Sequence, residues 1–117
     1  MASETLGRAL AKDVGTSGTN IFTASYTSAA EYTVVLGIVL ANTHSSAVTV
    51  DVELIPYNTS PSSIYLIKNL SIESGNSYEV IQSRIVLYNN TTAGDVIKAT
   101  CSTGSYIDAV VSFIQGV

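Results

Sequence analysis

Apolar and polar residues alternate with the two-residue period of a β-strand through most of the chain after residue 19. The clearest case is residues 47–56, "AVTVDVELIP", in which apolar residues at every second position alternate with Thr, Asp and Glu. Such alternation predicts a half-exposed antiparallel strand. Residues 31–42, "EYTVVLGIVLAN", are apolar almost throughout, which predicts a central strand covered on both faces, with a bulge or a close backbone approach at Gly37.

Shorter apolar segments, separated by turn-forming residues, continue this pattern to the C-terminus. They comprise residues 20–26, 63–70, 77–81, 84–88, 97–102 and 107–113. Together with the two longer segments they give about eight short strands and no strong internal helix. We therefore predict an all-β fold for residues 19–117, an antiparallel two-sheet β-sandwich of the jelly-roll-like or immunoglobulin-like type.

Residues 1–18 differ from this β body. Leu6, Ala9 and Leu10 can line one side of a short helical turn begun by Ser3, and the glycine- and serine-containing stretch 15–18 indicates a flexible joint. We predict that residues 1–18 are an N-terminal arm, peripheral to the sandwich domain of residues 19–117. The alternative is a frayed terminus without a role.

The composition is poor in charge for a chain of 117 residues. Charged residues make up 12% and hydrophobic residues 46%, and the net charge is −4. This charged fraction is about half the usual value. Ser, Thr and Asn supply the polar surface instead, and covering them with a partner costs less free energy than covering charges. These features indicate a protein that works in an assembly; a compact, hydroxyl-rich monomer is the alternative.

The same features bear on partners and location. Nucleic-acid affinity comes mainly from neutralised phosphates, so an acidic chain with five basic residues is a poor binder of nucleic acid. No signal-peptide pattern opens the sequence, and the longest apolar run, residues 32–41, is far short of the roughly 20 residues of a membrane helix. We expect a soluble protein made in the cytoplasm, with no nucleic-acid or membrane partner.

Side chains capable of catalysis or metal binding are few and scattered. His44, the single histidine, lies in the loop "NTHSS" without an acid nearby in sequence, and the single cysteine, Cys101, shares its expected inward face with apolar residues. Asp95 follows Gly94 at a chain corner, where a carboxylate can accept hydrogen bonds from the backbone N–H groups of the preceding turn. The carboxylates lack the spacing of a calcium loop. We predict a non-enzymatic protein with no catalytic, cofactor-binding or metal-binding residues.

Seven tyrosines and no tryptophan make an uneven aromatic set. Most of the tyrosines lie at or near the ends of predicted strands, where the ring can be buried while the hydroxyl stays hydrated. The tyrosines could either cap the core or form a contact surface for a partner, and the sequence does not decide between these interpretations. As partner-contact residues we select Leu6, Arg8 and Leu10 of the arm, together with Tyr57 and Tyr88.

The order of these segments resembles that of small virion structural β-sandwich proteins of tailed bacteriophages, including phages of cyanobacteria and marine bacteria. The stretch "TNIFTASYTSAAEYTVVLGIVLANTHSSAVTVDVEL" resembles their first half, in which a hydrophobic strand ending in Asn precedes an alternating Val/Thr strand. The stretches "IYLIKNLSIESGNSYEVI", "RIVLYNNTTAGDVIKATCS" and "SYIDAVVSFIQ" resemble the second half, so the likeness spans about residues 19–115. Gln115 stands where these proteins usually have an acidic residue.

The resemblance implies a non-enzymatic structural component of the virion. Its first implication is a capsid decoration (cement) protein that binds the outside of the capsid shell and stabilises it. The partners would be the major capsid protein and further copies of the chain, as a homodimer or homotrimer, with the arm reaching over neighbouring subunits. A tail, neck or fibre-attachment component of the virion is the alternative in the same class. A carbohydrate-binding β-sandwich module that uses loop Tyr and Asn is an alternative from another class, and a small hydrolase around His44 is a third.

Overall fold

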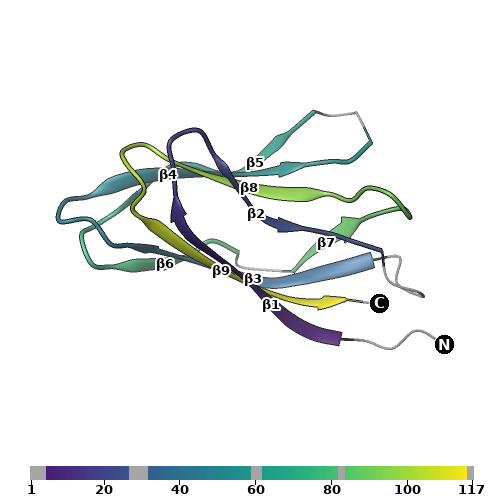
Figure 1. Ribbon diagram of the computed structural model, residues 1–117. Coiled ribbons are helices and arrows are strands. Elements are labelled where there is room, and N and C mark those ends of the chain that lie inside the picture. The colour runs from purple at the N-terminus through teal and green to yellow at the C-terminus, as the bar shows by residue number, and fades with distance from the viewer. Residues whose placement is uncertain (1–4, 27–31, 59–61, 82–83, 116–117) are drawn as a thin grey trace.

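The computed structural model describes residues 5–26, 32–58, 62–81 and 84–115, which form strands and turns without a helix. In chain order the strands are β1 (Thr5–Val14), β2 (Thr19–Thr23), β3 (Tyr32–Asn42), β4 (Val48–Ile55), β5 (Ile64–Ile72), β6 (Ser77–Glu79), β7 (Ile85–Tyr88), β8 (Val96–Cys101) and β9 (Ile107–Gln115). They form two antiparallel sheets that face each other as the layers of a sandwich (Figure 1). The predicted all-β, two-sheet sandwich is confirmed.

The strand order identifies the type of sandwich. One sheet has the order β1-β9-β3-β6, with β7 also paired to β3, and the other has the order β2-β8-β4-β5. When β6 and β7 are counted as one interrupted edge strand, the first strand pairs with the last, the second with the last but one, and so on inward to β4 and β5. This nested pairing is that of a long hairpin rolled into two sheets, which is a jelly roll. The structure thus has the first of the two sandwich types that the sequence left open.

The core lies between the sheets and is built by strand alternation. Buried inner residues at every second position are Val48, Val50 and Val52 on β4, Ile97, Ala99 and Cys101 on β8, and Ile107, Ala109 and Val111 on β9. Phe22 of β2 and Phe113 of β9 join the two layers, with their ring centroids 4.6 Å apart. The inward face expected for Cys101 is confirmed.

The described part of residues 1–18 contains an edge strand rather than a helical turn. β1 pairs with β9 along its length, and the side chain of Val14 is fully buried in the core. The predicted helical turn through Leu6 and Leu10 is therefore wrong; Ser3, where it was expected to begin, lies outside the described residues. The predicted boundary at residue 18 also does not separate an arm from the sandwich, because β1 forms one edge of the larger sheet.

The stretch 15–18 is held in place instead of forming a flexible joint. The carbonyl oxygen of Gly15 accepts hydrogen bonds from the backbone N–H of Gly18, at 3.4 Å, and of Cys101, at 3.0 Å. Gly18 has a φ of 93°, a conformation that favours glycine. The turn thus carries the chain from β1 in one sheet to β2 in the other.

Strand β3 is covered on one face only, whereas its continuous apolar sequence predicted cover on both. Val35, Ile38 and Leu40 are fully buried on its inner side. On its outer side Val39 remains 39% exposed, and no described segment lies over it. Of the two features predicted as alternatives at Gly37, a bulge and a close backbone approach, the structure shows the bulge, because the register between β3 and β9 shifts between Val35 and Gly37.

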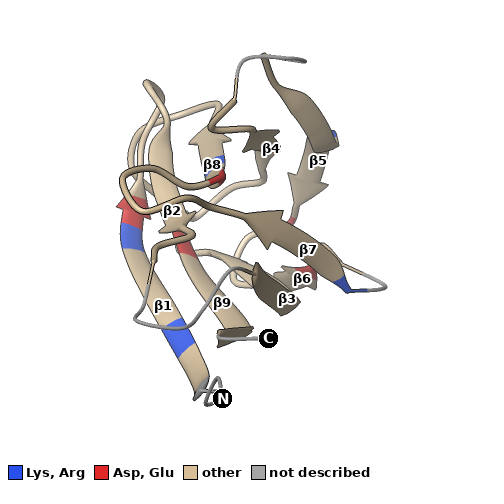
Figure 2. Cartoon of the chain, turned by 90° about the vertical axis from the view of Figure 1, so that its right-hand side faces the viewer, with Lys and Arg blue, Asp and Glu red and all other residues tan. Residues whose placement is uncertain are grey.

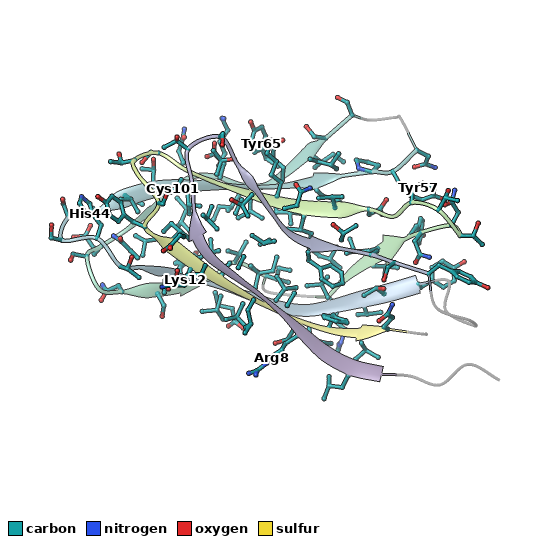
Figure 3. All side chains as sticks on the ribbon, viewed as in Figure 1. Arg8, Lys12, His44, Tyr57, Tyr65 and Cys101 are labelled. Atoms are coloured by element: carbon teal, nitrogen blue, oxygen red, sulfur yellow. The ribbon has the colours of Figure 1, made fainter. Side chains whose placement is uncertain are left out.

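The two ends of the described chain meet at one pole of the sandwich. Thr5 at the start of β1 pairs with Gln115 at the end of β9, so β1 begins where β9 ends (Figure 1). His44 lies at the opposite pole (Figure 3). No helix in the described part of the chain is long and apolar enough to cross a membrane.

Candidate assembly face

Three of the five predicted contact residues, Leu6, Arg8 and Leu10, lie together on the outer side of β1. Gly7 between them faces inward, since a Cβ at that position would come within 2.7 Å of Cζ of Phe113. Successive residues of a strand point to opposite faces, so the even-numbered residues of β1 turn away from the core. Leu6 and Leu10 are 73% and 65% exposed, and Figure 3 shows Arg8 pointing away from the sandwich.

The outer leucines of β1 continue across the larger sheet as two apolar rows. Residues directly opposite each other in antiparallel strands share a face of the sheet. The first row consists of Leu6, Ile114, Val34 and Val86 on β1, β9, β3 and β7. The second row consists of Leu10, Val110 and Val39 on β1, β9 and β3. A third row, Arg8, Ser112 and Gly37, lies between them. These three rows define what we call the assembly face.

The outer face of the smaller sheet has the opposite character. One row of opposed residues crosses all four strands of this sheet, β2, β8, β4 and β5, and consists of Asn20, Lys98, Glu53 and Tyr65. Two shorter rows pair Thr100 with Asp51 and Thr49 with Ser71. Nζ of Lys68 lies 3.9 Å from Oδ2 of Asp51 at this face. The sandwich therefore has one face of hydroxyl, amide and charged groups, and one face that is mainly aliphatic.

Charges on the assembly face gather at its edges. Arg8 and Lys12 lie on β1, and basic bands mark that strand in Figure 2. Nζ of Lys12 lies 3.8 Å from Oδ2 of Asp108 on β9. At the opposite edge Glu79 of β6 pairs with Val39, so Glu79 lies on the outer side of the sheet. Oε2 of Glu79 would lie 3.5 Å from a Cβ placed on Gly37. The carboxylate of Glu79 thus reaches back over the sheet toward the row of Arg8.

The centre of the assembly face leaves apolar area in contact with water. Val39 and Val110 are on interior strands of the sheet, yet 39% and 38% of their areas are exposed. Val86 in the other row is also exposed. Single exposed apolar residues are common, but contiguous rows across four strands are typical of a surface that another protein covers.

The other two predicted contact residues, Tyr57 and Tyr88, come together at the pole where the chain ends meet. The rings of Tyr32 and Tyr88, opposed on β3 and β7, have centroids 5.3 Å apart at an angle of 65°. With Tyr57 and Asn89 they line an open hollow of about 340 Å³. Oδ1 of Asn89 is buried and has no hydrogen-bond partner within the described protein.

A buried carboxylate positions these tyrosines. Oδ1 of Asp95 accepts the backbone N–H of Tyr57 at 3.0 Å, and Oδ2 accepts that of Tyr88 at 2.9 Å. Gly94 is needed beside it, because a Cβ there would overlap the carbonyl group of Ala24. Asp95 accepts backbone N–H groups, as predicted, but the predicted donors are wrong: they come from the segment after β4 and from β7, while Oδ1 of Asn90 accepts the N–H groups of Thr92 and Ala93 in the preceding turn.

The remaining candidate residues do not form a reaction site among the described residues. The ring of His44 stacks on that of Tyr106, with centroids 3.9 Å apart and an interplanar angle of 13°. Cys101 is buried, and its Sγ lies 3.1 Å from the carbonyl oxygen of Thr103. Within the described ranges no three His, Cys, Asp or Glu side chains are grouped so that they could hold a metal ion.

Sequence reasoning missed the four valines and the isoleucine, which are five of the seven apolar residues in the rows of the assembly face. The signal was present in residues 32–41, whose outward positions are as apolar as their inward ones. That pattern was interpreted as cover on both faces by the chain itself. The structure shows that nothing in the described part of the chain supplies the second cover.

Comparison with known proteins adds two solved structures of the same fold. A chain of the T13 IBDV viral particle, whose structure is described as a missing link in the evolution of icosahedral viruses, superposes with a TM-score of 0.57 at 9% identity. The match covers 96% of this chain but only 30% of that one, so this chain spans less than a third of its length. A chain of the Bacillus endospore appendages, a family of disulfide-linked pili, superposes with a TM-score of 0.54 at 8% identity, covering 100% of this chain and 90% of that one. No protein-family model matches the chain, and no curated protein does.

Proposed function

We propose that the protein is a structural component of a virion, and specifically a capsid decoration (cement) protein that binds the outside of the shell and stabilises it. The observation that carries this proposal is the assembly face, an uncovered aliphatic sheet face on a chain with few charges. Such a face is typical of a subunit that works within a larger assembly. The resemblance to phage virion proteins and the shared fold with a chain of a viral particle support the choice of assembly.

The copy number of the chain in purified particles of the virus that encodes it tests this proposal. A decoration protein should be present in the order of hundreds of copies, because it repeats with the shell, whereas a tail or neck component should be present in about six or twelve copies around one axis. Quantitative mass spectrometry against the major capsid protein measures the ratio. The low count would favour the tail or neck alternative, and absence from the particles would overturn the virion role altogether.

Stabilisation of the shell is tested separately by add-back. Particles stripped of the protein should unfold at a lower temperature than intact ones, and added pure protein should restore the difference, since a ligand that binds only the intact shell stabilises it by mass action. Differential scanning calorimetry measures the transition. If the transition temperature stayed the same after rebinding, the protein would bind the shell without stabilising it, which would contradict the cement role but not the decoration role.

The second neighbour suggests a filament subunit, but the thiol chemistry of this chain does not support its form of linkage. Those pili are described as disulfide-linked. Cys101 is the single cysteine of the 117 residues, and it is buried against the carbonyl of Thr103. A disulfide between subunits needs an accessible thiol on each, so the likeness to the pili supports the fold and not the linkage.

A carbohydrate-binding role is a second candidate, favoured by the hollow that Tyr57 and Tyr88 share with Tyr32 and Asn89. The exposed rings of Tyr32 and Tyr88 and the half-buried ring of Tyr57, beside an amide oxygen without a partner, could receive a sugar ring and one of its hydroxyls. On a glycan array Tyr57→Ala or Tyr88→Ala should weaken binding about tenfold or more. Tyr65→Ala, which removes an exposed ring from the other sheet, is the matched control. Binding absent from the unmodified protein, or equal in all variants, would reject this candidate.

A further inference from the structure

We propose that the partner on the assembly face is a second copy of this chain, packed face to face about a two-fold axis that runs parallel to the strands. This inference rests on the proposed function in one respect: both assume that another protein covers the assembly face, and the inference says which protein it is. Three observations lead to it: the order of apolar and polar rows on the face, the placement of its charges, and its size.

The rows are complementary to themselves under this symmetry. A two-fold axis parallel to the strands keeps each row at its own height and exchanges the two edges of the sheet. Leu6 of one copy then lies over Val86 of the other, and Ile114 lies over Val34. In the second apolar row Val110 lies over Val39. Between them Ser112 meets Gly37, over which the carboxylate of Glu79 reaches. At the central positions of the two apolar rows apolar groups thus meet apolar groups, while Leu10 at the end of the second row lies over Glu79.

Two different two-fold axes would bring the assembly faces of two copies together, one parallel to the strands and one perpendicular to them. The charges favour the parallel axis. A two-fold axis across the strands would stack β1 on β1 and bring cations of the two copies together, because Arg8 and Lys12 are both on its outer side. The axis parallel to the strands instead places Arg8 of each copy above the opposite edge, where the carboxylate of Glu79 reaches back over Gly37. Arg84, exposed just before β7, makes that edge mixed in charge. On β1 the carboxylates of Asp13 and Asp108 lie 3.9 and 3.8 Å from Nζ of Lys12, so Arg8 is the charge that distinguishes the two axes. Two Arg8–Glu79 pairs per dimer follow.

The size of the face suits a dimer of this kind. Four strand positions spaced about 4.8 Å apart, over the ten residues of β1 at about 3.3 Å each, give about 600 Å² for the whole outer side of the larger sheet, of which the three rows of the assembly face take about half. Two copies that pack over this whole side bury about 1,200 Å², which is the lower end of stable, specific interfaces. Two aliphatic sheet faces also pack in the manner of a β-sandwich core, in which aligned sheets interdigitate about 10 Å apart. The dimer leaves the hydroxylated face of each copy free for a shell.

The first test is the state of association of the pure, full-length chain. Sedimentation equilibrium from about 1 to 100 μM should show a monomer–dimer equilibrium, and Val110→Lys or Val39→Glu should raise its Kd about 100-fold or more, because each places two charges in the apolar centre. Both positions are on the outer side, and far-UV circular dichroism with thermal unfolding verifies that each variant folds. Ser71→Lys, on the opposite face, is the matched control and should dimerise like the unmodified chain.

A charge exchange tests the geometry itself. Arg8→Glu should raise the Kd about tenfold or more, because it sets two pairs of like charges against each other, and Glu79→Arg should do the same. The double variant Arg8→Glu with Glu79→Arg should restore dimerisation to within about threefold of the original Kd. A dimer that tolerates Val110→Lys, or single and double exchanges that weaken it alike, would overturn the proposal, as would a monomer at 100 μM or a trimer. None of these results depends on virus particles, so the copy-number experiment can fail or succeed independently.

Discussion

Removal of residues 2–14 should abolish the cooperative unfolding of the protein. The deletion takes away strand β1, which pairs with β9 over its whole length and contributes the fully buried Val14 to the core. It leaves the backbone groups of β9 along that edge without partners and exposes the inner layer around Phe113. Net stabilities of domains this size are about 5–15 kcal/mol, and the loss of one edge strand with its core contacts should exceed that range.

Thermal unfolding followed by circular dichroism, with amide spectra by NMR, measures the outcome for this truncation. Deletion of residues 2–4 is the control, since it leaves β1 complete and should change the transition midpoint little. A truncated chain that keeps a sharp transition at the original midpoint would show that residues 2–14 are a dispensable arm. It would also mean that β9 tolerates an open edge.

Asp95→Ala should lower the free energy of unfolding by about 3 kcal/mol or more, equivalent to a fall in the melting temperature of about 10 °C. The side chain is 93% buried, at 7% exposure, and its two oxygens accept the N–H groups of Tyr57 and Tyr88. Removing the carboxylate leaves both donors without partners, and each unpaired buried donor costs free energy in addition to the lost bond. Chemical denaturation at neutral pH measures the change.

Asp51→Ala is the matched control for that substitution. Its Oδ1 also accepts a backbone N–H, that of Asn69 at 2.7 Å, but the bond lies at an exposed edge where water can replace it. We expect a loss of about 1 kcal/mol or less. The loss of unfolding free energy for Asp95→Asn should lie between those for Asp95→Ala and Asp51→Ala, since the amide keeps one acceptor oxygen but turns an NH₂ donor toward the other backbone N–H. Equal losses for Asp95→Ala and Asp51→Ala would show that the corner at residues 94–95 does not depend on its carboxylate.

The sequence predicted eight of the nine described strands, most of them because apolar residues stand at every second position and face inward. It missed β1 for a steric reason. The inner side of β1 carries Gly7, Ala9 and Ala11, and Phe113 fills the space that a side chain at position 7 would need. Small residues give no hydrophobic period, while Leu6 and Leu10 on the outer side stand four residues apart, as on a helix. The period that is visible in this segment therefore belongs to the assembly face and not to the core.

Only the part of the candidate site that lies close together in sequence could be predicted. Leu6, Arg8 and Leu10 were selected as contact residues of an arm, and the structure brings them together on the outer side of a sheet edge. The apolar rows that extend from them arise from pairing between β1, β9, β3 and β7, strands far apart in sequence, and no local pattern encodes such pairing. Tyr57 and Tyr88 share a hollow because Asp95 binds both backbones, a tertiary link that periodicity cannot reveal.

The pairing of Thr5 with Gln115 has a practical consequence for engineering. Both chain ends leave the sandwich at the same pole, beside the tyrosines and far from His44. A fluorescent or enzymatic cargo fused to either end would therefore be displayed from one tip, and a short linker could join the two ends so that the polypeptide is reopened elsewhere. A circular permutant opened at the 73–76 turn would keep every strand while moving the new ends to another part of the surface.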